Sequence, residues 1–163
     1  MAEGRDMTDP TREHQLLKER VGRWKVDCTY YLNPNHPPLE VTATETVEMI
    51  GEFWARTRFV AEMDESTLLG SSTIGFEPHN DRWVSTWIDS TTPALFVFHG
   101  GMDEDAGAVE MTGSGPNPMT GEMAQYRSVD TILGPDRRRF DMYITLHTGD
   151  EIQMFAYEYT RVG

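Results

Sequence analysis

The alternation of apolar and polar residues along most of the chain constrains the fold more than any other feature of this sequence. From Trp24 to Leu32 every second residue is apolar, which is typical of an antiparallel strand with one buried face. Nine more segments of this kind follow, and turn-forming Gly, Pro, Asn and Asp residues separate them. They are centred on residues 41–49, 53–63, 68–76, 83–88, 95–99, 109–112, 123–132, 140–146 and 152–160.

Ten such strands in sequential order predict an all-β fold, a closed antiparallel up-and-down β-barrel with one N-terminal α-helix. No helical pattern lies between the strands, so βαβ units are not expected. Closure is favoured over a sandwich because it removes both exposed edges of the sheet. The 163 residues suit one domain, and we expect a mobile tail over residues 1–8 and a single barrel domain over residues 9–163.

A helix is predicted just before the first strand. Asp9, which a proline follows, has the character of an N-cap, and Gly22 is expected to end the helix. His14, Leu17 and Val21 have the spacing of one packing face. We expect the helix and Trp24 to close one end of the barrel.

The charge balance and the cysteine content exclude several classes of protein. Acidic residues number 27 against 14 basic ones, which gives a formal net charge of −13. A nucleic-acid partner is therefore not expected, because phosphate binding needs a basic surface. Cys28 is the only cysteine, which excludes an internal disulfide and a cysteine-based zinc site. The sequence contains no signal-like or membrane-spanning apolar segment, so we expect a cytoplasmic protein without a membrane partner.

Several motifs resemble a known family. A Gly-x-Trp at residues 22–24, after a short helix, is similar to the opening of the calycin group, which includes lipocalins, fatty-acid-binding proteins and nitrobindins. With the segments at 85–89, 117–121, 140–143 and 157–161, the whole pattern resembles a bacterial family of unknown function numbered fifteen seventy-nine. The resemblance implies a lipocalin-like barrel and no established activity. Asn117 stands where that family usually has Asp, which weakens any role of this loop in binding a cation.

Polar residues on the predicted inward faces mark a candidate site in the lumen. Trp87 and Asp89 share one face near the end of their strand, and Arg127 is predicted to reach Asp89 from a later strand. Such a pair would bind the polar group of a ligand, or serve as an anchor and a general base. The alternative, which stays open here, is a structural ion pair that closes the barrel end.

His99 is a further candidate, because it shares a face with Leu95 and Val97 and is predicted to point inward. An imidazole in the lumen would act as an acid or a base. If its neighbours Phe96 and Phe98 point inward instead, His99 faces solvent and this role fails.

No cofactor and no metal are expected. A haem-binding barrel of the nitrobindin type would use a late histidine, but His147 directly precedes a Thr-Gly-Asp turn and is expected at an exposed rim. No two histidines have a spacing typical of metal ligands.

Three hypotheses of function follow. The preferred one is the binding of a small hydrophobic or aromatic molecule with one polar group, because aromatic and methionine side chains accept apolar ligands of imperfect fit. The second is a cofactor-independent isomerase, cyclase or hydrolase for an enclosed hydrophobic substrate, with Asp89 and His99 as catalytic residues. The third is a dimerisation or interaction module whose lumen is packed shut, and a homodimer is left open. The predicted ligand-binding residues are Tyr30, Trp87, Asp89, His99, Arg127 and Met142.

Overall fold

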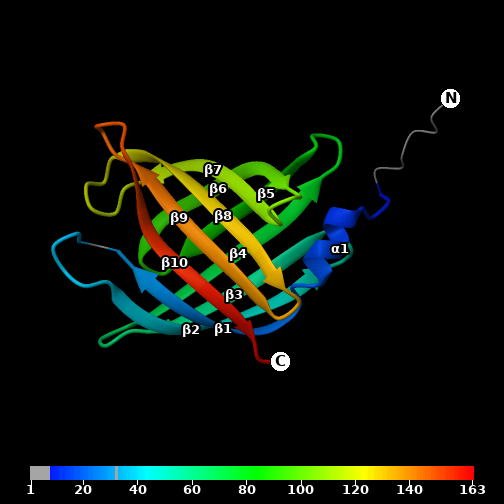
Figure 1. Ribbon diagram of the computed structural model, residues 1–163, viewed down its shortest axis with the longest axis horizontal. Coiled ribbons are helices and arrows are strands. Elements are labelled where there is room, and N and C mark those ends of the chain that lie inside the picture. Colours follow the sequence, from blue (N-terminus) through cyan, green and yellow to red (C-terminus); the bar gives the residue numbers. More distant parts are fainter. Residues whose placement is uncertain (1–7, 32) are drawn as a thin grey trace.

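The computed structural model describes residues 8–31 and 33–163, and it contains a closed ten-stranded antiparallel barrel with one short helix (Figure 1). The predicted fold class is thereby confirmed. Leu32 and residues 1–7 of the predicted tail lie outside the described residues. The elements are α1 (Arg12–Lys18), β1 (Gly22–Tyr30), β2 (Leu39–Ile50), β3 (Trp54–Glu62), β4 (Thr67–Glu77), β5 (Arg82–Asp89), β6 (Thr92–Asp103), β7 (Ala108–Pro116), β8 (Met123–Gly134), β9 (Arg137–Thr145) and β10 (Glu151–Arg161).

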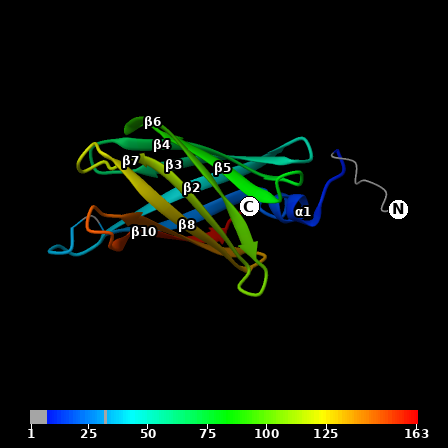
Figure 2. The ribbon, with the colours of Figure 1, turned by 90° about the horizontal axis from the view of Figure 1, so that it is seen from above.

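The barrel is a meander that closes between its first and last strands. Each strand pairs with the next one along the chain, and β1 pairs with β10 from Trp24 opposite Arg161 to Tyr30 opposite Phe155. Because this last pairing uses the free edges of both terminal strands, every strand has two neighbours. Figures 1 and 2 show α1 at one end of the barrel, and the β1–β2 and β9–β10 connections at the other, which we call the loop end.

Helix α1 begins later than predicted, because Thr11 rather than Asp9 is its N-cap. The Thr11 side chain accepts from the backbone N–H of His14, and His14 Nδ1 accepts from the backbone N–H of Thr11 at 2.9 Å. His14 Nε2 donates to the carbonyl of Phe76 in β4 at 3.0 Å, and Leu17 is fully buried. Two residues of the predicted packing face, His14 and Leu17, therefore hold the helix against the barrel. No helix in the described part of the chain is long and apolar enough to cross a membrane.

Gly22 starts β1 rather than capping the helix. Its φ of +135° favours glycine, and a Cβ atom there would lie 2.5 Å from the carbonyl oxygen of Gly163. Val21 is 41% exposed and takes no part in the packing. Trp24 is buried and donates from Nε1 to the carbonyl of Arg20 at 2.9 Å. This contact ties the turn after α1 to the start of β1.

Candidate functional site

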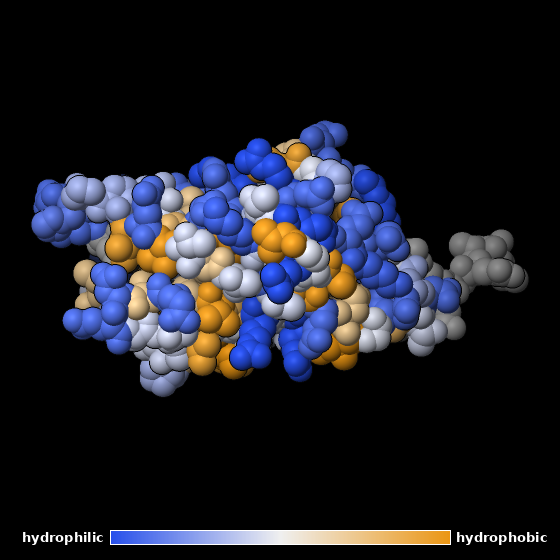
Figure 3. Space-filling model, turned by 90° about the horizontal axis from the view of Figure 1, so that it is seen from below, coloured by the Kyte–Doolittle hydropathy of each residue, from blue (hydrophilic) through white to orange (hydrophobic). Residues whose placement is uncertain are grey.

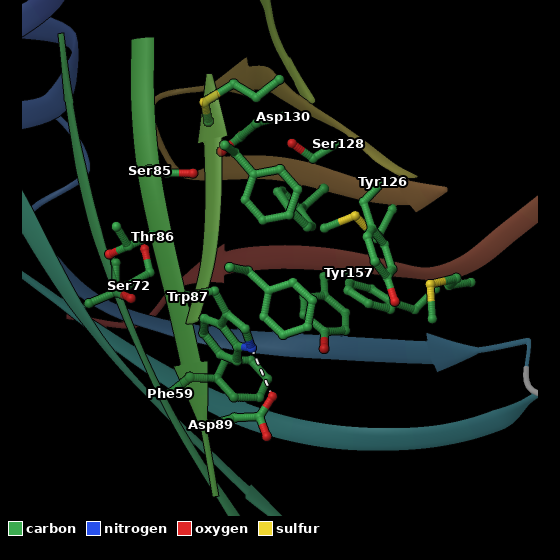
Figure 4. Close-up of a pocket in the computed structure, with 18 of the residues that line it drawn as sticks. Phe59, Ser72, Ser85, Thr86, Trp87, Asp89, Tyr126, Ser128, Asp130 and Tyr157 are labelled. Atoms are coloured by element: carbon green, nitrogen blue, oxygen red, sulfur yellow. Dashed lines mark hydrogen bonds between the residues drawn. The ribbon is translucent and has the colours of Figure 1, made fainter. Parts of the chain in front are cut away.

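A cavity of about 350 Å³ lies inside the barrel. Its lining on β5 runs from Ser85 to Asp89, which spans about 13 Å at ~3.3 Å per residue. The lumen is therefore hollow rather than filled by side chains, and the hypothesis of a lumen packed shut is wrong. Most of the wall is apolar or aromatic (Figure 4). The aromatic lining residues are Tyr30, Phe59, Trp87, Phe96, Phe98, Tyr126, Phe140, Phe155, Tyr157 and Tyr159.

Tyr157 is the centre of the aromatic wall. Its ring stacks on Phe155 at 4.5 Å and on Phe59 at 5.5 Å, measured between ring centroids, and Phe59 meets Trp87 edge to face at 5.9 Å. The hydroxyls of Tyr30 and Tyr157 share a hydrogen bond of 2.8 Å. Burial raises the pKa of both phenols, so they stay neutral in the physiological range. Rings in mutual contact and a shared hydrogen bond together fix the shape of the wall.

Trp87 and Asp89 lie together in the cavity wall toward the loop end. Asp89 Oδ2 accepts from Trp87 Nε1 at 2.8 Å (Figure 4), and Oδ1 accepts from the backbone N–H and the hydroxyl of Thr91 at 2.8 and 2.5 Å. Both carboxylate oxygens are thus engaged, one with the indole and the other with the β5–β6 turn. This arrangement holds the Trp87 ring and the Asp89 carboxylate in place in the cavity wall.

Arg127 lies on the outside of the barrel, so its predicted inward direction is wrong. Its guanidinium donates to both carboxylate oxygens of Glu151, at 3.0 and 2.6 Å, and stacks on Tyr143 with 4.4 Å to the ring centroid. Both faces of β8 mix apolar with polar residues, so alternation alone does not decide which face is buried. The residues of β8 that line the cavity are Tyr126, Ser128 and Asp130.

His99 also points outward and is exposed, and its predicted place in the lumen is wrong. Phe96 and Phe98 line the cavity instead. Trp87 pairs directly with Phe96, and opposite residues of an antiparallel pair lie on the same face of the sheet. An inward Trp87 therefore requires an inward Phe96, which turns His99 to solvent and separates it from Asp89.

Two other predicted residues, Tyr30 and Met142, line the cavity. His147 is exposed at the β9–β10 turn, where it pairs with Glu122 of the β7–β8 connection. Within the ranges 8–31 and 33–163, no three His, Cys, Asp or Glu side chains are grouped as metal ligands.

A set of buried charged residues at the end of the cavity opposite Asp89 was not predicted from the sequence. Asp130 Oδ2 accepts from Arg20 Nη1 at 2.8 Å, and Glu45 Oε2 accepts from Arg138 Nη2 at 3.1 Å. All four side chains are at least nine-tenths buried, and Glu45, Asp130 and Arg138 line the cavity. Figure 4 shows Asp130 at one end of the cavity and Asp89 at the other. We call Arg20, Glu45, Asp130 and Arg138 the polar floor.

The electrostatics of the polar floor combine burial with mutual attraction. Burial raises the pKa of Glu45, and the neighbouring Arg138 opposes that rise. Burial also lowers the pKa of Arg20, which Asp130 opposes. Burial acts to lower the pKa of Arg138 too, but Asp130 and Glu45 outweigh it and raise that pKa. Two carboxyl groups and two guanidinium groups thus lie in mutual contact at this end of the cavity.

A comparison with known families places the chain. It matches the family described as "Protein of unknown function (DUF1579)" over residues 9–161. The protein belongs to the DUF1579 family. This membership confirms the resemblance carried by the sequence motifs. Four of those motifs supply residues of the cavity wall, namely 85–89 with Trp87, 117–121 with Pro118, 140–143 with Met142 and 157–161 with Tyr157.

Two solved structures share the fold of this DUF1579 protein. Rv2717c from M. tuberculosis superposes with a TM-score of 0.70 at 12% identity, over 95% of this chain and 100% of that one. The S-type phycobiliprotein lyase CPES from Guillardia theta superposes with a TM-score of 0.60 at 14% identity, over 94% and 99%. At such identities the likeness establishes the barrel fold alone. No curated protein matches the sequence significantly.

Proposed function

We propose that this DUF1579 protein binds a small, largely apolar molecule with one polar group inside the barrel. The observation that supports this most is the cavity of about 350 Å³, with aromatic walls and a polar floor. Small-molecule sites have this character, since most of their lining is apolar and a few polar groups orient the ligand. Tyr30, Trp87 and Met142 would contact the apolar part of the ligand.

The loop end is the proposed entrance. Thr91 and Pro118 line the cavity there and are exposed. In Figure 3 hydrophobic residues lie between two hydrophilic projections at the end of the molecule away from the N-terminus. A ligand entering from this side would pass Asp89 and Trp87 before it reaches the polar floor.

Binding is better supported than catalysis. Asp89 is held by Trp87 and Thr91, and His99 lies outside the cavity. The two residues predicted as catalytic therefore do not meet in one site. A barrel that orients a ligand between an aromatic wall and a polar floor needs neither of them as an acid or a base.

Thermal unfolding in the presence of candidate ligands tests this function. The panel contains long-chain alcohols and acids, aromatic acids, haem and a bilin, the last because a phycobiliprotein lyase shares the fold. A ligand specific for the folded state at 100 times its Kd adds about 2.7 kcal/mol, which raises the Tm by roughly 5–11 °C in a chain of this size. A panel without any such shift would contradict the proposal.

A matched pair of tryptophan variants shows where the ligand binds. Trp87 lines the cavity, whereas Trp54 lies on the opposite face of its strand from the inward Ala55 and Phe59. Quenching of tryptophan fluorescence by the ligand should be largely lost in Trp87→Phe and retained in Trp54→Phe. The reverse result would place the ligand outside the barrel.

A further inference from the structure

Asp89 carries a negative charge in the cavity wall that no positive charge neutralises. Within residues 8–31 and 33–163, no Lys, Arg or His forms an ion pair with it, and its three hydrogen bonds come from neutral donors of Trp87 and Thr91. A carboxylate has about four acceptor positions, so one is left. The side chain is half-buried and lines the cavity. Asp89 is therefore within reach of a ligand, unlike the polar floor.

A negatively charged ligand finds no partner in the same cavity. Arg138 is the only Lys, Arg or His among the described residues of the lining. Its side chain is 7% exposed and pairs with Glu45 and Asp130. The charge of Asp89 also acts within the lumen, since it adds to the rise that burial causes in the pKa of Tyr30. A carboxylate or a phosphate group on a ligand would be repelled there.

The connections around the proposed entrance have the same sign of charge. Alternate connections of this meander lie at one end of the barrel, so the loop end is formed by residues 31–38, 63–66, 90–91, 117–122 and 146–150. These connections contain no Lys and no Arg. Their acidic residues are Asp64, Glu65, Glu122 and Asp150. The entrance therefore favours the approach of a cation over that of an anion.

We propose that the ligand of this barrel is a cationic amphiphile, an apolar chain or ring system with one ammonium group, and that Asp89 binds the ammonium at the loop end. This inference rests on the proposed binding function and names its ligand class. The ammonium donates to the remaining acceptor position of Asp89, and the apolar part lies along the aromatic wall. The rings beside Asp89 favour the same sign of charge, because the faces of aromatic rings attract cations.

Three probes of one chain length test the sign of the ligand charge: decylammonium, 1-decanol and decanoate. Their Kd values are measured with the full chain at about pH 7, where the amine is protonated and the acid is ionised, in about 0.15 M salt, which screens the general surface charge. Decylammonium should bind about 5- to 20-fold more tightly than decanol, because a hydrogen bond between charged groups is stronger than a neutral one. Decanoate should bind about fivefold more weakly than decanol, or worse, because Asp89 repels it.

A pair of variants at the loop end locates the group that is recognised. Asp89→Asn keeps the shape of the side chain and removes its charge, so decylammonium should bind within about twofold of decanol. An unchanged Kd for decanol shows that the cavity is intact in this variant. Asp64→Asn is the matched control, because Asp64 is exposed at the same end and lies outside the cavity lining. It removes an equal charge and should preserve the preference for decylammonium.

The outcomes separate this inference from the function on which it rests. Decanol or decanoate binding as tightly as decylammonium overturns the inference and leaves ligand binding in place. A preference for decylammonium that survives in Asp89→Asn, or that Asp64→Asn reduces equally, also overturns it, because the surface charge would then be the cause. If none of the three probes binds and the wider panel also gives no shift, the proposed function itself fails.

Discussion

Removing the charge of Asp130 is the most direct test of the buried charges in this barrel. Asp130→Asn keeps the shape of the side chain but leaves Arg20, 2.8 Å away, and Arg138, 3.4 Å away, facing a neutral group. All of these side chains are at most 8% exposed, so water does little to compensate. Breaking a buried pair in this way costs about 3–5 kcal/mol, out of the ~5–15 kcal/mol by which domains are usually stable.

Urea unfolding of the variant and the parent measures this loss. Arg127→Met is the control, because it removes an arginine from a half-exposed surface pair with Glu151, and such pairs contribute only about 0–1 kcal/mol. In a double-mutant cycle, adding Arg20→Met to Asp130→Asn should cost less than the two separate losses together, since the uncompensated cation is removed. If Asp130→Asn loses no more than Arg127→Met, the reasoning about burial is wrong.

Further predictions concern the packing of the wall and the response to pH. Gly70→Ala should displace the Trp87 ring, because the new Cβ would lie 2.1 Å from Cη2 of Trp87. The expected loss of folding stability is roughly 1–3 kcal/mol, and an unchanged tryptophan emission spectrum would argue against the displacement. Cys28 should resist thiol reagents in the folded protein at about pH 8, because burial raises its pKa to about 12; modification as fast as in the urea-unfolded chain would refute this. Folding raises the pKa values of Cys28 and Tyr157, so as the pH rises the unfolded chain loses these protons before the folded one does. The urea midpoint should therefore be insensitive to these groups below about pH 8 and should fall above it. A midpoint that stays level to about pH 11 would contradict that sign.

The strands and their pairing order could be predicted because the signal for a strand is local. A period of two over a few residues marks a half-buried strand wherever it lies in the chain, and sequential strands without helices between them leave closure as the way to remove the edges. The same local pattern placed Trp87 and Asp89 on one face of β5, where both line the cavity.

The direction of side chains in β6 could not be settled by alternation, because both of its faces are apolar over residues 95–98. His99 was expected inside because it shares a face with Leu95 and Val97. The pairing of Phe96 with the inward Trp87 decided the other way and puts His99 on the outer face.

The sequence by itself determined the ten strands, the helix before them and the closed sheet, since each follows from the spacing of neighbouring residues. Only the tertiary structure decided that the barrel holds a polar floor. Arg20 and Asp130 are 110 positions apart, and Arg138 and Glu45 are 93 apart. A charged residue on an inward face is tolerated only with its partner, and no local pattern reports a partner that barrel closure brings from a distant strand.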